Sequence, residues 1–164
     1  MKRLMGFIAL LGFVLGLALL TPTQTLAADT VSVAKTIVQQ PTPSISGITK
    51  YTFTFSSDDG TIARAAANSA ANVIGWIAKV QYVPGAVNTP DAAADIQLYT
   101  HLTTGVNILY GLLDNVGATE TIDTPVSSAA GVGVFLGGET LYFSAASLGA
   151  GTNDGVLYVW VITP

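Results

Sequence analysis

Few residues of this chain could take part in acid–base or nucleophilic catalysis. His101 is the only histidine, and there is no cysteine, so thiol chemistry and disulfide bonds are both excluded. A Ser–His–Asp triad would have to be built around His101, and no G-x-S-x-G segment marks a nucleophile. We therefore expect His101 to cap a strand or to lie in the turn of "YTHLTTG". We assign no catalytic residue and predict that the protein is not an enzyme.

Carboxylates are more numerous but form no recognisable catalytic or metal-binding pattern. A glycosidase needs two carboxylates across one scissile bond, and the positions of Glu120 and Glu139 among the aspartates single out no pair. The adjacent Asp58 and Asp59, with Asn153-Asp154, offer oxygens for calcium, but the EF-hand pattern is absent. One histidine without cysteine does not supply the usual zinc ligands. We expect no metal and no cofactor.

Aromatic residues are the more informative group. Aromatic side chains on strands usually belong to a core or to an interface. In the C-terminal "GTNDGVLYVWVITP", Tyr158 and Trp160 alternate with Leu157 and Val159, so a strand here is apolar on both faces. Such a strand is typical of the centre of a sheet that also presents aromatic surface to a partner. The candidate interface residues are Trp76, Tyr82, Tyr158, Trp160 and Ile162.

Composition limits the classes of partner. Only 10% of the residues are charged, against about 25% in ordinary soluble domains. Once residues 1–27 are set aside, four basic residues face ten acidic ones, a formal charge of −6 that argues against nucleic acid as a ligand. A surface so poor in charge favours coverage by neighbouring protein copies.

The N-terminus has the three parts of a secretory signal peptide. Lys2 and Arg3 precede an apolar stretch, and "TPTQTLAAD" supplies small residues for cleavage. We predict cleavage after Ala27, with Ala28 as the second choice, and export to the periplasm or beyond. The alternative is an uncleaved anchor, since 17 apolar residues reach the lower end of the membrane-spanning range, about 17–25 residues. Membrane contact is expected only through this leader.

The first part of the mature chain indicates strands with short interruptions. Residues 28–48 are predicted to be an extended arm or linker, either an edge strand or a flexible stalk, and 49–164 the folded domain. "KYTFTF" alternates between aromatic and polar residues, as a half-buried strand does. "TIARAAANSAAN" is predicted to be a loop or a short helix. In "NVIGWIAKVQYVPG", Trp76 is expected to share a face with Val80 and Tyr82, while Lys79 and Gln81 point outward.

The remaining segments continue this pattern. "DIQLYTHL" and "GVNILYGLL" are predicted to form a hairpin, although "NILYGLLDN" could be one helical coil. "ATETIDTPV", "GVGVFLGGETLYFSAA" and "GVLYVWVI" are predicted strands, with a turn at Asn153-Asp154-Gly155. About eight strands without βαβ alternation predict an all-β fold, a single antiparallel β-sandwich or jelly-roll-like domain after a signal-peptide helix.

Three segments carry a family resemblance: "GWIAKVQYVPGAVNTP", "AADIQLYTHLTTGVNILYGLLDNVGATETI" and "GGETLYFSAASLGAGTNDGVLYVWVI". Together they resemble small phage-encoded proteins thought to be virion-associated β-sandwich or jelly-roll modules, some with export-type leaders. The resemblance covers roughly residues 51–162 and implies no catalytic residues. It implies a structural or interaction module that packs against its own copies or against virion or cell-surface proteins. The alternative is a secreted module that binds carbohydrate or a cell surface through exposed aromatics.

Overall fold

The protein is all-β in the part of the chain that its computed structural model describes, residues 29–42, 46–123 and 133–164. Seven strands form one antiparallel sheet, and these residues contain no α-helix. Within the same ranges, no helix has the length and apolar character needed to cross a membrane. The predicted signal peptide, residues 1–27, lies outside the described residues.

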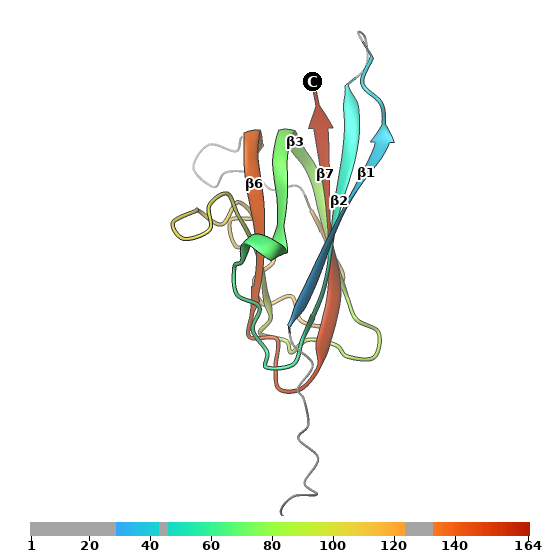
Figure 1. The fold of residues 1–164 in the computed structure, drawn as a ribbon. Coiled ribbons are helices and arrows are strands. Elements are labelled where there is room, and N and C mark those ends of the chain that lie inside the picture. Colours follow the sequence, from blue (N-terminus) through green and yellow to red (C-terminus); the bar gives the residue numbers. More distant parts are fainter. Residues whose placement is uncertain (1–28, 43–45, 124–132) are drawn as a thin grey trace, which may run out of the picture.

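The strands and one short 3-10 helix follow each other along the chain (Figure 1). Their bounds are β1 Thr30–Gln39, β2 Gly47–Ser57, η1 Ala66–Asn68, β3 Ser69–Pro84, β4 Asp95–Tyr99, β5 Thr121–Asp123, β6 Phe135–Ala146 and β7 Asn153–Thr163. In space the order is β1-β2-β7-β3-β6-β4, with β5 paired to β3. The C-terminal strand β7 is therefore central, as its two apolar faces predicted.

Strand β3 holds the two halves of the sheet together. Its first half pairs with β6 and its second half with β7 and β5. Trp76 is paired on both sides, with Phe135 of β6 and Ile162 of β7. Gly75 has φ +130° and a Cβ there would collide with the carbonyl oxygen of Ile162, so glycine permits this close crossing.

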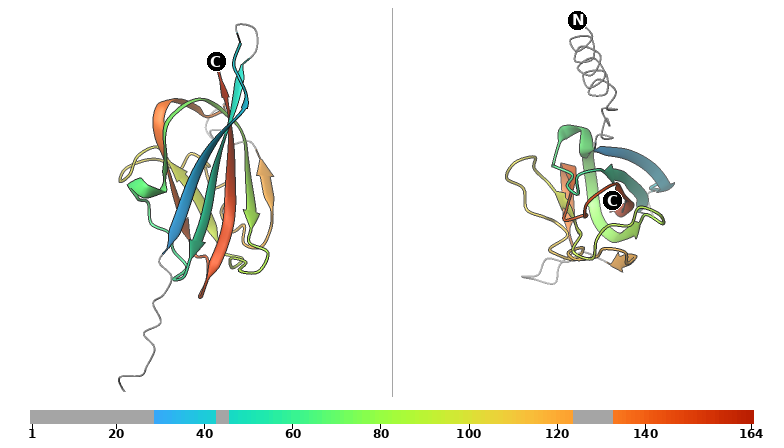
Figure 2. Two further views of the ribbon diagram at one scale, coloured as in Figure 1. Left: turned by 45° about the vertical axis from the view of Figure 1, so that its right-hand side comes forward. Right: turned by 90° about the horizontal axis from the view of Figure 1, so that it is seen from below.

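The sheet bends far enough to bring distant strands face to face. Strands β7 and β3 separate β2 from β6 in the strand order, yet the ring of Phe143 on β6 lies 5.8 Å from that of Phe53 and 5.1 Å from that of Phe55. The two views of Figure 2 show the sheet curving in this way. The core lies inside the bend, with Leu157, Val159 and Val161 of β7 fully buried. The opposite side chains of β7 are left at the outer surface.

The N-terminal arm is an edge strand. β1 pairs with β2 from Thr30↔Ser56 to Gln39↔Ile48, which decides between the two alternatives left open by the sequence. β2 contains the predicted "KYTFTF" strand, and its Tyr51, Phe53 and Phe55 are buried while the residues between them are more exposed. A short helical turn, η1, occurs in the alanine-rich segment.

The predicted hairpin after residue 95 is wrong in its second half. β4 forms, but residues 107–115 make successive tight turns, with Tyr110 N–H donating to Asn107 O and Leu112 N–H to Leu109 O. The side chain of Asn107 accepts from Leu109 N–H at 3.1 Å, which favours a turn over a strand. Seven strands result in place of about eight.

These turns cover the outer edge of β4. Ile96 N–H donates to Leu113 O, and Ile108 N–H donates to Leu98 O. The buried Leu109 and Leu113 anchor the segment in the core. Unpaired strand edges are prone to aggregation. The turn segment therefore protects the edge of β4, as another strand paired there would.

The predicted turn at Asn153-Asp154-Gly155 is also displaced. These residues begin β7, and residues 147–152 make the connection. Asn153 instead donates its side-chain amide to Gly151 O at 2.8 Å, closing the loop from the strand side. Gly155 faces Phe55 in the register, and a Cβ there would lie 2.7 Å from the Phe55 ring. Glycine is therefore needed at position 155 for packing against Phe55 and not for a turn.

Two phenylalanines on β6 test this account of the core. Phe143→Ala should lower the free energy of unfolding by about 3–5 kcal/mol because it empties the centre of the bend. Phe135→Ala on the same strand should change it by less than about 0.5 kcal/mol, since half of Phe135 is exposed. Urea denaturation followed by tryptophan fluorescence measures both, and equal losses would contradict the assignment of inner and outer faces.

Candidate interaction face

The side chains of β2, β3, β6 and β7 that point away from the core form a continuous surface, here called the outer face. Cross-strand neighbours in a sheet lie about 4.5–5.5 Å apart on the same face, so the register places these side chains in rows. The left view of Figure 2 shows β2, β7 and β3 running side by side. Two of the rows carry most of the aromatic and cationic groups of this surface.

The first of them, the apolar row, crosses four strands. Ile48 on β2 is paired with Ile162, Ile162 with Trp76, and Trp76 with Phe135. The indole of Trp76 and the ring of Phe135 are 5.1 Å apart. Trp76, Phe135 and Ile162 remain 46%, 50% and 37% exposed, respectively. Four adjacent strands thus present apolar groups to solvent at one level of the sheet.

The second, the lysine row, consists of Lys50, Trp160 and Lys79. Trp160 on the central β7 is paired with Lys50 on one side and Lys79 on the other. The Lys79 ammonium lies 4.5 Å from the centre of the Trp160 ring, and the Lys50 ammonium 5.1 Å from that of Tyr158. Cation–π contacts of this kind are worth about 0.5–1 kcal/mol at exposed sites. They hold two positive charges against the aromatic surface.

A β-bulge decides which residues of β3 belong to the outer face. The pairing with β7 shifts between Ile77 and Lys79, and one extra residue reverses the side to which later residues point. Trp76 therefore shares the outer face with Lys79, whereas Val80 and Tyr82 are buried. The expectation that Trp76 shares a face with Val80 and Tyr82 was wrong for this reason.

Tyr82 is consequently not available at the surface. Its side chain is fully buried, its ring stacks against Phe55 at 6.5 Å, and its hydroxyl donates to Gly117 O at 2.9 Å. The other four candidate interface residues, Trp76, Tyr158, Trp160 and Ile162, lie together on the outer face. Sequence inspection missed Ile48, Lys50, Lys79 and Phe135 as their neighbours, because alternation within a strand does not reveal the register between strands.

A shallow hollow of about 430 Å³ lies on the same face, nearer the start of β7. Hydroxyl side chains of β1 and β2 line one side of it, and Val83, Val156 and Asp154 line the other. The Asp154 carboxylate accepts a hydrogen bond from the Asn88 amide at 3.0 Å. The hollow differs from the aromatic rows because it adds four hydroxyl groups and one carboxylate to a lining that is otherwise largely apolar.

The remaining candidate for catalysis, His101, is exposed in the loop after β4. Its backbone carbonyl accepts from Arg64, whose guanidinium stacks 3.5 Å from the centre of the Tyr99 ring. In the described parts of the chain, no hydrogen bond joins its imidazole to a serine or an aspartate. The structure therefore brings no triad together at His101.

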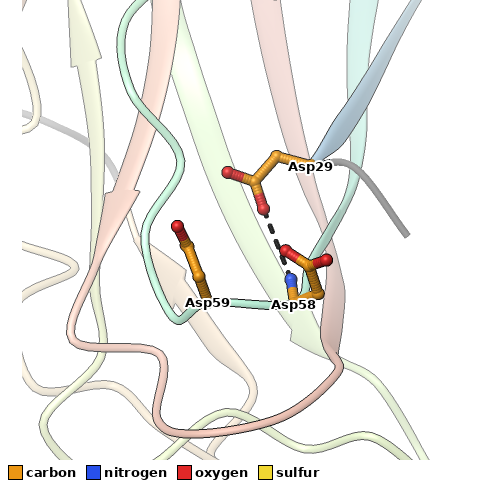
Figure 3. A group of neighbouring side chains, drawn as sticks. All are labelled: Asp29, Asp58 and Asp59. Atoms are coloured by element: carbon orange, nitrogen blue, oxygen red, sulfur yellow. Dashed lines mark hydrogen bonds between the residues drawn. The ribbon is translucent and has the colours of Figure 1, made fainter. Parts of the chain in front are cut away.

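Three carboxylates converge where β1 begins and β2 ends (Figure 3). Oxygens of Asp29, Asp58 and Asp59 all lie within 4.8 Å of one another. Asp29 accepts from Asp58 N–H at 3.3 Å, which ties the start of β1 to the end of β2. Asp59 accepts from Thr61 N–H at 2.9 Å, which is a turn-forming contact. Asp154, considered with them as a calcium ligand, is hydrogen-bonded to Asn88 instead. We call these three residues the acidic turn.

The two glutamates serve separate local contacts. Glu120 accepts from the Gln81 side chain at 2.6 Å, and Glu139 accepts from Gly137 N–H within its own strand. They do not face each other across a cleft.

Comparison of the chain with known protein families, with curated proteins and with solved structures gives no match.

Burial beneath the sheet changes the ionisation of Tyr82. Desolvation, with a smaller contribution from the charge of Asp154, raises the pKa of its phenol to about 12. The ordinary value is about 10, so the unfolded chain loses this proton first as the pH rises. The neutral phenol therefore stabilises the fold fully below about pH 10, and this contribution is lost as the pH rises towards 12.

Comparison with Tyr82→Phe isolates this effect from other titrations. The variant should be less stable at pH 9 by about 1–3 kcal/mol, because Gly117 O loses its buried hydrogen-bond donor. The stability difference between the two proteins should shrink as the pH approaches 12. Urea unfolding at half-unit pH steps measures it, and a difference that stays constant would show that the phenol does not titrate late.

Proposed function

We propose that the protein is a non-enzymatic interaction module whose outer face packs against a protein partner in a larger assembly. The apolar row carries this proposal. It presents Trp76, Phe135 and Ile162 to solvent at adjacent positions, and together with Ile48 it spans four strands, about 14 Å from first to last. A contiguous exposed apolar patch on a folded chain usually marks an interface.

The aromatic character of the face also supports protein as the partner. Tryptophan, tyrosine and phenylalanine are enriched at the centres of protein interfaces. Lys50 and Lys79 lie over the rings of Tyr158 and Trp160, where a sugar ring would otherwise stack. The long aliphatic stems of both lysines extend the apolar surface and keep the charges at its border.

The architecture and the location belong to the same proposal. We infer that the bent sheet acts as a two-layer β-sandwich, jelly-roll-like in outline, because rings of β2 and β6 meet across its interior. Export is inferred from residues 1–27, and association with a virion or a cell surface from the resemblance of residues 51–162. These inferences describe the architecture of the module and the place where it acts. The outer face is the surface through which we propose that it binds.

Site-specific photo-crosslinking in the cells that make the protein tests the proposal. A benzoylphenylalanine at position 135 should give one discrete adduct, because this position lies in the apolar row. The matched control is position 87, where Val87 is 90% exposed on a loop away from the rows. Adducts of equal yield at both positions, or none at 135, would contradict a specific interaction through the outer face.

Carbohydrate is the second candidate ligand, favoured by the hollow rather than by the aromatic rows. Thr30, Ser32, Thr54 and Ser56 offer four hydroxyl groups around a volume suited to one or two sugar rings. If a glycan binds there, Thr54→Val should weaken binding on a glycan array at least tenfold, and Trp76→Ala should leave it unchanged. Binding that depends on Trp76 instead would place a sugar on the apolar row.

A further inference from the structure

We propose that the partner on the outer face is a second copy of this chain, docked head to tail through its acidic turn. This inference rests on the proposed function of the outer face and goes further by naming the occupant. It follows from the separation of charge within the molecule. The described residues carry ten acidic and four basic side chains, and two of the four basic ones, Lys50 and Lys79, lie in the lysine row.

The part of the chain that the structure describes gives neither lysine of that row a direct carboxylate partner. Among the described residues no ion pair joins Lys50 or Lys79 to a carboxylate; Lys79 Nζ donates to Gln81 and lies over Trp160. Gln81 in turn donates to Glu120, so Lys79 is linked to a carboxylate through one amide and not directly. In the described parts of the chain, two ammonium groups thus flank an apolar aromatic surface without a directly bonded counter-charge. An anionic partner that also buries apolar area is the chemical complement of such a face.

Strand geometry keeps the acidic turn away from the lysine row of the same molecule. Lys50 and Asp58 are eight residues apart along β2 and the turn after it, about 26 Å at the rise of an extended strand. That separation exceeds the Debye length at physiological salt, about 8 Å. Each charged region is therefore left to pair with its complement on another copy.

The shape of the acidic end suits contact with a flat aromatic surface. Its turn packs against the loop before β7, where a Cβ on Gly60 would collide with Gly149 O. Next to them, Ala150 and Gly151 are exposed and small. Such residues let the rings of Trp76 and Trp160 approach the backbone closely, while Asp29 and Asp58 reach the two ammonium groups.

A face-to-face dimer is disfavoured by the same charges. Two outer faces packed together would enclose four ammonium groups against two carboxylates, the Glu139 of each copy beside Phe135. Removing unpaired charges from water costs several kcal/mol per ion. Head-to-tail docking avoids this cost. Because the outer face docks on a different surface, the acidic turn, an assembly of any length keeps one free outer face and one free acidic turn. Growth into a filament or a closed ring follows.

Complementation between two charge-reversed variants tests the inference on the full chain. The face variant, Lys50→Glu with Lys79→Glu, keeps its acidic turn. The end variant, Asp29→Lys with Asp58→Lys, keeps its outer face and retains Asp59, which holds the turn. By sedimentation velocity, wild type should form oligomers larger than dimers that dissociate in 1 M salt. Each variant alone should be monomeric, because its face and its end then carry the same charge. An equal mixture should again give oligomers larger than dimers, because the native pair of surfaces and the charge-reversed pair are both complementary.

The control for net charge is Asp95→Lys with Asp114→Lys, which changes the total charge as the end variant does but lies in β4 and the turn segment after it, outside the acidic turn and outside both rows. It should assemble like wild type, and circular dichroism should show all variants folded. Oligomers that persist in either variant alone, or a mixture that stays monomeric, overturn the inference. A monomeric wild type that still crosslinks to another protein through position 135 overturns it while sustaining the proposed function. If wild type is monomeric and position 135 gives no crosslinked adduct, both the head-to-tail inference and the proposed function are overturned.

Discussion

The meeting of Phe143 with Phe53 and Phe55 is the contact on which the rest of the structure depends. These rings join β2 to β6 across the interior although two strands separate them in the sheet. A flat seven-stranded sheet would leave both of its faces in water, so closing the bend buries one face completely and commits the other to the outside. The chain has no disulfide bond to reinforce that closure, and ring packing must therefore supply much of the energy that holds the two halves together.

The bulge between Ile77 and Lys79 then assigns residues to the two faces. Before it, Trp76 points outward; after it, Val80 and Tyr82 point inward, so both halves of β3 bury apolar side chains although the strict alternation is interrupted. Without the extra residue, Trp76 would share a face with Val80 and Tyr82, and the aromatic rows would lose their bridge between β7 and β6. Bulges that redirect side chains in this way are frequent beside functional surfaces.

The limits of prediction from sequence have the same physical origin. Alternation in β2 and β7 depends only on local residue type, so the buried Phe53 and Val159 and the outward Trp160 could be predicted. The all-β class follows from local chemistry as well. The bulge, the turns that replace a strand at residues 107–115, and the pairing of Trp76 with Phe135 depend on contacts between distant segments. Single-strand patterns do not encode these contacts, and Tyr82 was assigned to the interface for that reason.

In the function that we propose, folding and binding use opposite faces of the same central strand. Leu157, Val159 and Val161 are buried in the core, while Tyr158, Trp160 and Ile162 remain at the surface with lysines beside them. These outward groups are partly covered by their neighbours, and the apolar surface that stays exposed on them is available for association. In the same proposal, the two neighbouring lysines keep that surface hydrated and would make association with a partner sensitive to charge. A strand that is apolar on both sides can therefore hold the fold together and, independently of it, select what the fold binds.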